Sequence, residues 1–181
     1  MKVIGVLGGP HRNGNTAKLI EAVLEGATEV GHDVVFVRLA DIHVRHIEER
    51  DEKLYYPEDD LSKLYPEFES MGALVLATPI YYDQVDSRMK QFIDRLHYWS
   101  KTHGEVYRAR FPDGVKLVNC ITFANPSDNY YDNVLTWMKV RMEHYWNMEH
   151  VCDLKASETR KNPVTENNTL LEKAKILGKC L

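Results

Sequence analysis

The sequence predicts a doubly wound α/β fold built on one parallel sheet, and two observations support this prediction. Short apolar segments rich in branched residues alternate with longer segments whose apolar residues fall on one helical face. The strand-like segments are almost continuously apolar, as in parallel sheets that are covered by helices on both faces. Five such strands, taken with their intervening helices, favour the spatial order 2-1-3-4-5.

Each expected element can be placed on the chain by its pattern. The first strand is expected at residues 2–7 and the first helix at residues 17–27, where apolar side chains recur on one face. Further strands are expected at residues 33–39, 72–77, 115–123 and 150–155. Further helices are expected from Asp60 or Ser62 to Met71, and at residues 86–100, 127–147 and 165–178. Residues 41–60 show no clean period, and residues 101–114 are expected to form a loop.

Length and composition favour a single domain over residues 1–181, because no repeat, linker or low-complexity tract divides the chain. The formal net charge of −4, with both signs interspersed, argues against general nucleic-acid binding, and no basic run favours a membrane surface. No apolar segment has the length of a membrane span or of a secretory signal. The dispersed Cys120, Cys152 and Cys180 lack metal or redox spacing and fit reduced thiols, so we expect a cytoplasmic protein.

The loop between the first strand and the first helix is the most informative stretch of the sequence. It reads GGPHRNGNT (residues 8–16) and opens directly onto a helix N-terminus, where unpaired backbone N–H groups and the helix dipole favour a phosphate. The lysine of a nucleotide-hydrolysing P-loop and the spacing of a dinucleotide fingerprint are both absent. We therefore expect a phosphate monoester, held by Asn13, Asn15, Thr16 and backbone amides. The alternative is an ordinary turn in which Asn15 or Thr16 merely caps the helix.

This loop resembles the G-S-P-R-x-x-G-N-T phosphate loop of the NADPH-dependent FMN reductases and iron–sulfur flavoproteins, a flavodoxin-like group. Downstream, TPIYY (residues 78–82) and KQFIDR (residues 90–95) are similar to the S-P-V-Y-F loop and K-x-F-I-D-R helix that follow the third strand in that group. The resemblance covers roughly residues 1–100, and beyond residue 110 it rests on the order of elements. It implies a flavodoxin-like three-layer sandwich.

The resemblance also implies a function. FMN would be bound without a covalent link, reduced by NADH or NADPH, and reoxidised by a small acceptor such as a quinone or free flavin. The flavin carries the hydride chemistry, so no catalytic side chain is expected. The implied contacts to the phosphate are Gly9, Asn13, Gly14, Asn15 and Thr16, with His11 or Arg12 as the cation. Those to the ring are Pro79, Ile80, Tyr81 and Tyr82, and the segment from Thr122 to Asn125 would close the ring pocket. The helix at residues 86–100 is implied to form the interface of a homodimer or tetramer.

Several positions depart from the family pattern. Gly9 replaces a serine and His11 replaces an arginine, and bulkier residues such as Asn125 follow the fourth strand where relatives have glycine. These changes predict weaker FMN binding than in a relative with the full motif, because charge-assisted contacts are lost.

The cysteine cluster of the iron–sulfur relatives is also missing. Ile47, Arg50 and Lys53 stand approximately in its place, and a [4Fe–4S] cluster needs four thiolates. His43 and His46 lie near Glu48 and Glu49, but acidic loops of this kind are mostly solvated, so no metal site is expected.

The sequence leaves alternatives open for the role of two tyrosines and for the function of the chain. Tyr81 and Tyr82 are read either as ring contacts or as rim and interface residues. The chain is either a reductase or a flavodoxin in the strict sense, which passes electrons to a protein partner. A third possibility is a binding protein that kept the fold and lost the flavin, since fold does not fix function.

Overall fold

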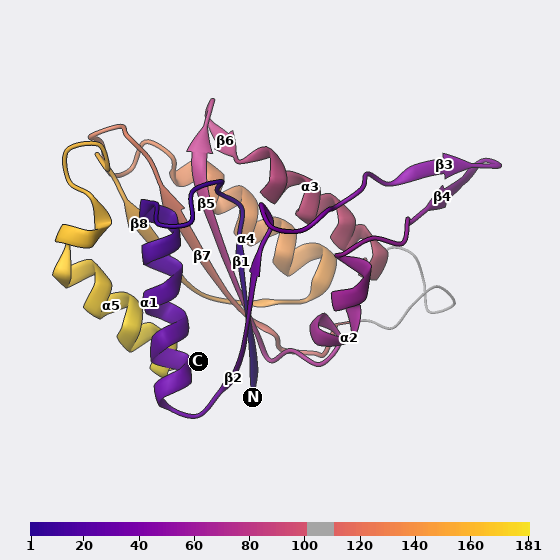
Figure 1. The fold of residues 1–181 in the computed structure, drawn as a ribbon, viewed down its shortest axis with the longest axis horizontal. Coiled ribbons are helices and arrows are strands. Elements are labelled where there is room, and N and C mark those ends of the chain that lie inside the picture. The colour runs from indigo at the N-terminus through magenta and orange to yellow at the C-terminus, as the bar shows by residue number, and fades with distance from the viewer. Residues whose placement is uncertain (101–110) are drawn as a thin grey trace.

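A parallel sheet in the order β2-β1-β5-β7-β8 forms the centre of the protein (Figure 1). The computed structural model describes residues 1–100 and 111–181. The strands are β1 (Lys2–Leu7), β2 (Asp33–Arg38), β5 (Ala73–Tyr81), β7 (Lys116–Thr122) and β8 (Glu149–Ala156). Every neighbouring pair on this path is parallel. The predicted doubly wound fold and its strand order 2-1-3-4-5 are confirmed.

Helices cover both faces of this sheet and complete a three-layer sandwich (Figure 1). Helices α1 (Asn15–Glu29) and α5 (Asn168–Lys179) lie on one face. Helices α3 (Ser87–Arg95) and α4 (Asp132–Trp146), with the short α2 (Tyr65–Phe68), lie on the other. Side chains alternate along each strand, so Val3 packs into the α1 and α5 layer while Ile4 packs into the opposite layer.

Helices α1 and α5 touch through their backbones at two glycines. A Cβ atom on Gly26 would lie 2.0 Å from the carbonyl oxygen of Lys175, and one on Gly178 would lie 1.9 Å from that of Val23. Lys175 also pairs with Glu29 at 2.6 Å across the same contact. Since neither glycine can carry a side chain without a shift of backbone, the two helices are held at a fixed short separation.

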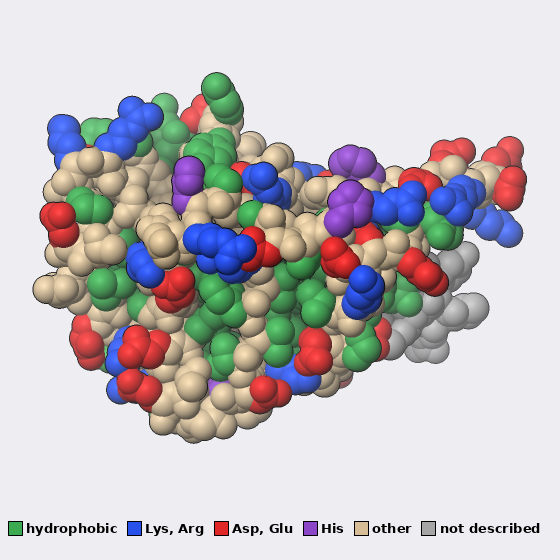
Figure 2. All heavy atoms as spheres, viewed as in Figure 1, with side chains coloured by type: hydrophobic (Ala, Val, Ile, Leu, Met, Phe, Trp, Pro, Cys, Tyr) green, Lys and Arg blue, Asp and Glu red, His purple; other side chains and the backbone are tan. Residues whose placement is uncertain are grey.

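The stretch at residues 41–60, which shows no sequence period, contains an antiparallel hairpin of β3 (Glu48–Arg50) and β4 (Lys53–Tyr55). The hairpin projects from the body of the protein and carries charged side chains of both signs (Figures 1 and 2). Its two turn residues, Asp51 and Glu52, have φ values of 51° and 60°. Such turns usually contain Asn-Gly or Asp-Gly, which explains why the sequence did not predict this one.

Other boundaries also differ from those expected. Strand β5 continues through Thr78 to Tyr81, because Ile121 and Thr122 of β7 still pair with its end, and it forms a hairpin with β6 (Gln84–Val85). The expected loop at residues 78–82 is therefore mostly strand. The helix expected to end at Met71 is broken into a 3₁₀ turn (Ser62–Leu64) and α2, where proline stands in the first turn.

The last helices and loops show smaller differences. Helix α3 ends at Arg95 and is continued only by a 3₁₀ turn (Leu96–Trp99), and α4 begins at Asp132 rather than near Ser127. A 3₁₀ turn (Val164–Glu166) precedes α5. Most of the loop expected at residues 101–114 lies outside the described residues. Within the described parts of the chain, no helix combines the length and the apolar character that a membrane span requires.

Candidate functional site

A pocket of about 270 Å³ opens at the carboxyl edge of the sheet. It lies where β1 and β5 adjoin, at the point from which the chain winds in opposite directions across the sheet. Four segments that follow or end the central strands form its walls: Gly9, Pro10, His11, Gly14, Asn15 and Thr16 after β1, Pro79, Ile80 and Tyr81 in β5, Thr122, Phe123 and Ala124 at β7, and Thr159 and Arg160 after β8.

The start of α1 contributes unpaired backbone donors to this pocket. Gly14 is the N-cap residue, with extended φ and ψ of −77° and 170°, and no side chain caps the helix. Gly14 N–H donates to His11 O at 3.3 Å, and the first intrahelical bond runs from Lys18 N–H to Gly14 O at 3.0 Å. The N–H groups of Asn15, Thr16 and Ala17, in the first turn, therefore have no acceptor within the helix. The ordinary turn capped by Asn15 or Thr16 is therefore not what the chain forms.

The side chains of Asn15 and Thr16 reach the pocket but are already engaged. The Asn15 side chain accepts a hydrogen bond from Val164 N–H at 2.7 Å and donates to Thr159 O at 3.4 Å. The hydroxyls of Thr16 and Thr122 lie 2.6 Å apart. One of these two hydroxyls donates to the other, so the second retains a proton for a ligand. Asn15 thus joins the start of α1 to the loop after β8, at Thr159 and Val164, a role that the sequence did not predict.

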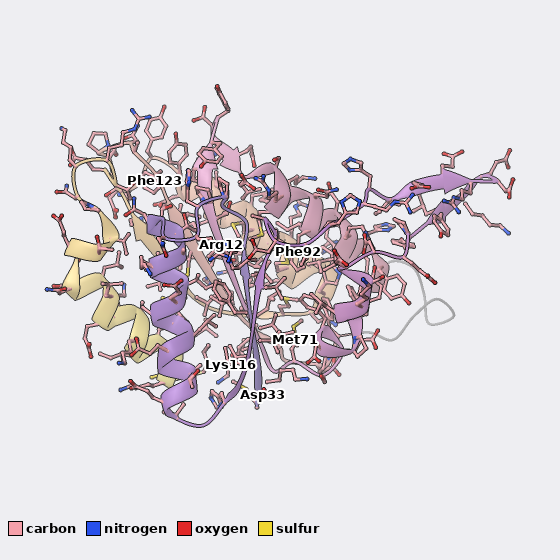
Figure 3. The ribbon with its side chains drawn as sticks, viewed as in Figure 1. Arg12, Asp33, Met71, Phe92, Lys116 and Phe123 are labelled. Carbon is pink, nitrogen blue, oxygen red and sulfur yellow. The ribbon has the colours of Figure 1, made fainter. Side chains whose placement is uncertain are left out.

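His11 and Arg12, the two candidates for the cation beside the phosphate, lie in different surroundings. His11 lines the pocket. Arg12 does not: its side chain is 70% exposed and its Nη2 donates to Asp41 Oδ1 at 2.7 Å. Asp41 also pairs with Arg38 Nε at 3.1 Å, so Arg12 belongs to a charged group beyond the end of β2. In Figure 3 Arg12 and Phe123 lie at the carboxyl edge, opposite Lys116 and Asp33.

Of the other residues predicted to contact FMN, some line the pocket and some do not. Pro79, Ile80, Tyr81 and Thr122 line the pocket, as does Gly9, whose missing Cβ would lie 3.1 Å from Pro79 Cδ. Asn13, Tyr82 and Asn125 do not line it. Tyr82 lies fully exposed in the β5–β6 turn, and Asn125 turns its Oδ1 to accept from Ser127 N–H at 2.8 Å.

Sequence reasoning missed three lining residues, Pro10, Thr159 and Arg160, and it did not single out Phe123 and Ala124 individually. Phe123 and Ala124 lie inside the segment that was expected to close the pocket, so only their individual roles were overlooked. Thr159 and Arg160 follow the last strand, and the signal was available, because the carboxyl ends of all parallel strands share one edge.

The second sequence motif, KQFIDR, ends in an arginine that lies outside the pocket. The side chains of Arg95 and Asp59 are fully buried and form an ion pair. Arg95 also donates to the Tyr65 hydroxyl at 2.8 Å and to the carbonyl oxygen of Arg45 at 2.9 Å. Burial raises the pKa of Asp59, but hydrogen bonds from Arg95 and from backbone N–H groups outweigh burial and bring that pKa below its ordinary value. The motif therefore holds residues 45–59 against α3.

The described parts of the chain do not bring metal-ligating side chains together. Residues 1–100 and 111–181 contain no group of three or more histidine, cysteine and acidic side chains placed to hold a metal ion. Of the cysteines, Cys120 is buried and Cys180 is exposed.

The sequence profile of the NADPH-dependent FMN reductases matches residues 1–111, which is more than half of the chain. The chain belongs to this family.

Curated relatives of this FMN reductase family member are iron–sulfur flavoproteins of archaea. The protein of Archaeoglobus fulgidus is 33% identical over 100 residues, which are 53% of this chain and 46% of the relative. The protein of Methanosarcina thermophila is 27% identical over 99 residues, or 52% of each chain. The chain spans about half the length of the curated relatives it matches.

Solved structures show the same fold over nearly the whole chain. The NAD(P)H:quinone oxidoreductase from Methanothermobacter marburgensis superposes with a TM-score of 0.72 at 18% identity, covering 99% of this chain and 96% of its own. An FMN-dependent NADH-azoreductase from Bacillus anthracis, solved in complex with FMN, gives a TM-score of 0.73 at 15% identity and covers 99% of each chain. At these identities the likeness concerns the fold.

The residues around the pocket of this FMN reductase family member fit the chemistry of FMN. Uncapped N–H groups of α1 and the nearby His11 and Arg160 suit a phosphate. Ile80, Tyr81 and Phe123 provide apolar and aromatic surface for a flat ring. Gly9 keeps its side of the pocket clear, because a side chain there would press against Pro79 or enter the pocket.

Proposed function

We propose that the protein binds FMN noncovalently in this pocket and passes electrons from NADH or NADPH to a small acceptor such as a quinone or free flavin. One observation carries the proposal: an uncapped helix start and apolar walls meet in a single pocket at the carboxyl edge of the sheet. Bound FMN would supply the hydride chemistry. The chain's own residues would bind the phosphate, orient the ring and limit access of water.

Each part of the pocket has a role in this proposal. The α1 N–H groups and the Thr16–Thr122 hydroxyl pair would donate to the phosphate. Pro79, Ile80 and Tyr81 would lie along the ring on one wall, and Phe123 and Ala124 on another. The nicotinamide donor rests on the family, whose members are described as NADPH-dependent.

Flavin binding is tested first by titrating purified protein with FMN and following the quenching of flavin fluorescence. A pocket-filling variant, Ala124→Trp, is expected to weaken FMN binding by at least about tenfold because its indole would occupy ring space. Val140→Trp is the matched control, since Val140 is exposed on α4 and does not line the pocket. Absence of FMN binding by wild type, or equal binding by both variants, would refute the proposed site.

The enzymatic part of the proposal needs a separate measurement. Steady-state oxidation of NADH and NADPH by FMN-loaded protein is compared with and without a quinone. We expect turnover that depends on the quinone and is lost in Ala124→Trp. Stoichiometric flavin binding without NAD(P)H oxidation would instead indicate an electron carrier of the flavodoxin type.

We further propose that the protein is cytoplasmic and assembles as a homodimer or tetramer. Support for assembly comes from an apolar groove of about 760 Å³ between the β3–β4 hairpin and helices α3 and α4. Leu54 on the hairpin is 54% exposed beside this groove, and Ile93 and Trp137 also line it. Sedimentation at micromolar concentration tests assembly, and a monomer throughout that range would contradict it.

A further inference from the structure

A flavin phosphate carries a charge of about −1.5 to −2 at neutral pH, and a helix N-terminus offers only about half a positive charge. A full cation in the pocket is therefore expected. The arginine nearest in sequence, Arg12, is paired with Asp41 and does not line the pocket. His11 lines the pocket, but an imidazole is not a permanent cation as a guanidinium is.

Arg160 meets this requirement from the far end of the chain. It lies in the loop between β8 and α5 and lines the pocket together with residues of the phosphate loop. Among residues 1–100 and 111–181, no acidic side chain pairs with it. The nearby Glu158 is engaged by Lys161 Nζ at 2.9 Å and Asn162 Nδ2 at 3.1 Å. The guanidinium of Arg160 thus remains available to a ligand.

The backbone next to Arg160 is fixed by four hydrogen bonds. Thr159 N–H and its hydroxyl both donate to Phe123 O at 3.1 Å, which joins this loop to the end of β7. Asn15 donates to Thr159 O at 3.4 Å and accepts from Val164 N–H at 2.7 Å, which joins the loop to α1. Arg160 is therefore held on a loop whose position is set by the two elements that border the pocket.

We propose that Arg160 supplies the permanent cation for the flavin phosphate, and that Asn15 positions the loop that carries it. The proposal rests on the function proposed above. It assigns Asn15 an indirect role: its side-chain hydrogen bonds go to the β8–α5 loop, and its effect on the ligand passes through Arg160.

The first experiment compares two arginines that lie at the same edge of the sheet. Dissociation constants for FMN and for riboflavin, which lacks the phosphate, are measured by fluorescence quenching for wild type, Arg160→Gln and Arg12→Gln. We expect Arg160→Gln to weaken FMN about 10–100-fold, the range for a charge-assisted hydrogen bond, and riboflavin less than about twofold. Arg12→Gln should change neither by more than about threefold, since Arg12 pairs with Asp41. Arg160→Lys should restore part of the lost affinity.

The outcomes separate the two proposals. If wild type binds neither FMN nor riboflavin, the proposed function fails and the role of Arg160 fails with it. If wild type binds FMN and Arg160→Gln leaves that binding unchanged, only the role of Arg160 is overturned. Equal losses for Arg12→Gln and Arg160→Gln, or equal losses for FMN and riboflavin, would likewise overturn it.

The second experiment tests the positioning role of Asn15 with a double-mutant cycle. If Asn15 acts through Arg160, Asn15→Ala combined with Arg160→Gln should bind FMN within about twofold of Arg160→Gln alone. Additive losses would mean that Asn15 contacts the phosphate itself, and the positioning role would be wrong. Should Asn15→Ala fold poorly, Asn15→Asp combined with Arg160→Gln gives the cycle for Asn15, because aspartate keeps the acceptor for Val164 N–H and loses the donor to Thr159 O.

Discussion

The two arginine-bearing motifs of this chain differ in how their polar groups are used. In the loop after β1, backbone donors at the start of α1 remain uncapped, and His11 lines an open pocket. At the end of α3, Arg95 is fully buried and its guanidinium is bound by Asp59, Tyr65 and backbone carbonyls. The first region leaves backbone donors at the start of α1 for a ligand, although its Arg12 pairs with Asp41. In the second region the guanidinium of Arg95 is bonded within the fold.

This difference shows that a motif's residue types do not decide its role. The same holds outside the motifs: Arg95 is buried against a carboxylate, whereas Arg160, in the loop after β8, lines a pocket with no acidic partner in the described residues. Burial and the number of partners decide which arginine is structural. Substitutions in each region test this contrast, and the largest effect is expected at the buried pair of Asp59 and Arg95.

Asp59→Asn is expected to lower the free energy of unfolding by about 3–5 kcal/mol, because it leaves the Arg95 charge buried without its counter-ion. Urea unfolding followed by circular dichroism measures the change. Asp94→Asn is the matched control: Asp94 pairs with Lys90 on the exposed face of α3, where a loss below about 1 kcal/mol is expected. Similar losses in both variants would contradict a structural role for the buried pair.

Thr16→Val is expected to weaken FMN binding by about 1.5–3 kcal/mol, because it removes one member of the hydroxyl pair that faces the phosphate site. Riboflavin binding should fall much less. Calorimetric titration with both ligands tests this, and Thr136→Val on the exposed part of α4 is the control. Equal losses for the two ligands would place the phosphate elsewhere.

The buried pair also predicts how stability depends on pH. Because the pKa of Asp59 is lower in the folded protein than in the unfolded chain, its stabilisation is fully present above about pH 4 and is lost as pH falls through the folded pKa. Between pH 4 and 2 the unfolding free energy of wild type should therefore fall by up to about 1.4 kcal/mol per pH unit more than that of Asp59→Asn. Parallel profiles for the two proteins would show that this carboxyl does not govern acid unfolding.

The smallest effect is expected for His11. His11→Arg would place a permanent second cation in the pocket beside Arg160, so FMN affinity should rise by no more than about fivefold. His43→Arg, outside the pocket, is the matched control and should leave FMN affinity unchanged. Fluorescence titration at one fixed pH measures both, and an equal gain in the two variants would show that position 11 does not face the phosphate.

The sequence predicted the fold well because β1, β5 and β7 are mostly apolar and helices α1, α3 and α5 each have one apolar face. It predicted the position of the pocket for the same reason, since the loop before α1 and the segment at Pro79 both follow strands. It also predicted most of the residues that line the pocket, but not Arg12, Asn13, Tyr82 and Asn125, which were expected there and do not line it. Arg12 turns to Asp41 and Asn125 turns to its own backbone, and both choices depend on neighbours that local patterns do not specify.

The two features that the sequence did not predict, Arg160 at the pocket and the β3–β4 hairpin, have a common cause. Arg160 reaches the pocket from a position 144 residues beyond Thr16, and only the shared edge of a parallel sheet brings the two together. The β3–β4 hairpin turns through Asp51 and Glu52, which are not the residues that usually mark such a turn. Both failures come from tertiary context that overrides local preference.

The glycine contact between α1 and α5 has a consequence for how affinity can be tuned. Gly26 lies about 16 Å along α1 from Asn15, far from any ligand. A methyl group there would drive the two helices apart, and the separation would open the 2.7 Å bond between Asn15 and Val164 at the other end of α1. Substitutions that never touch flavin would thus appear in a screen for weakened cofactor retention, and their side-chain volume at position 26 or 178 would rank their severity.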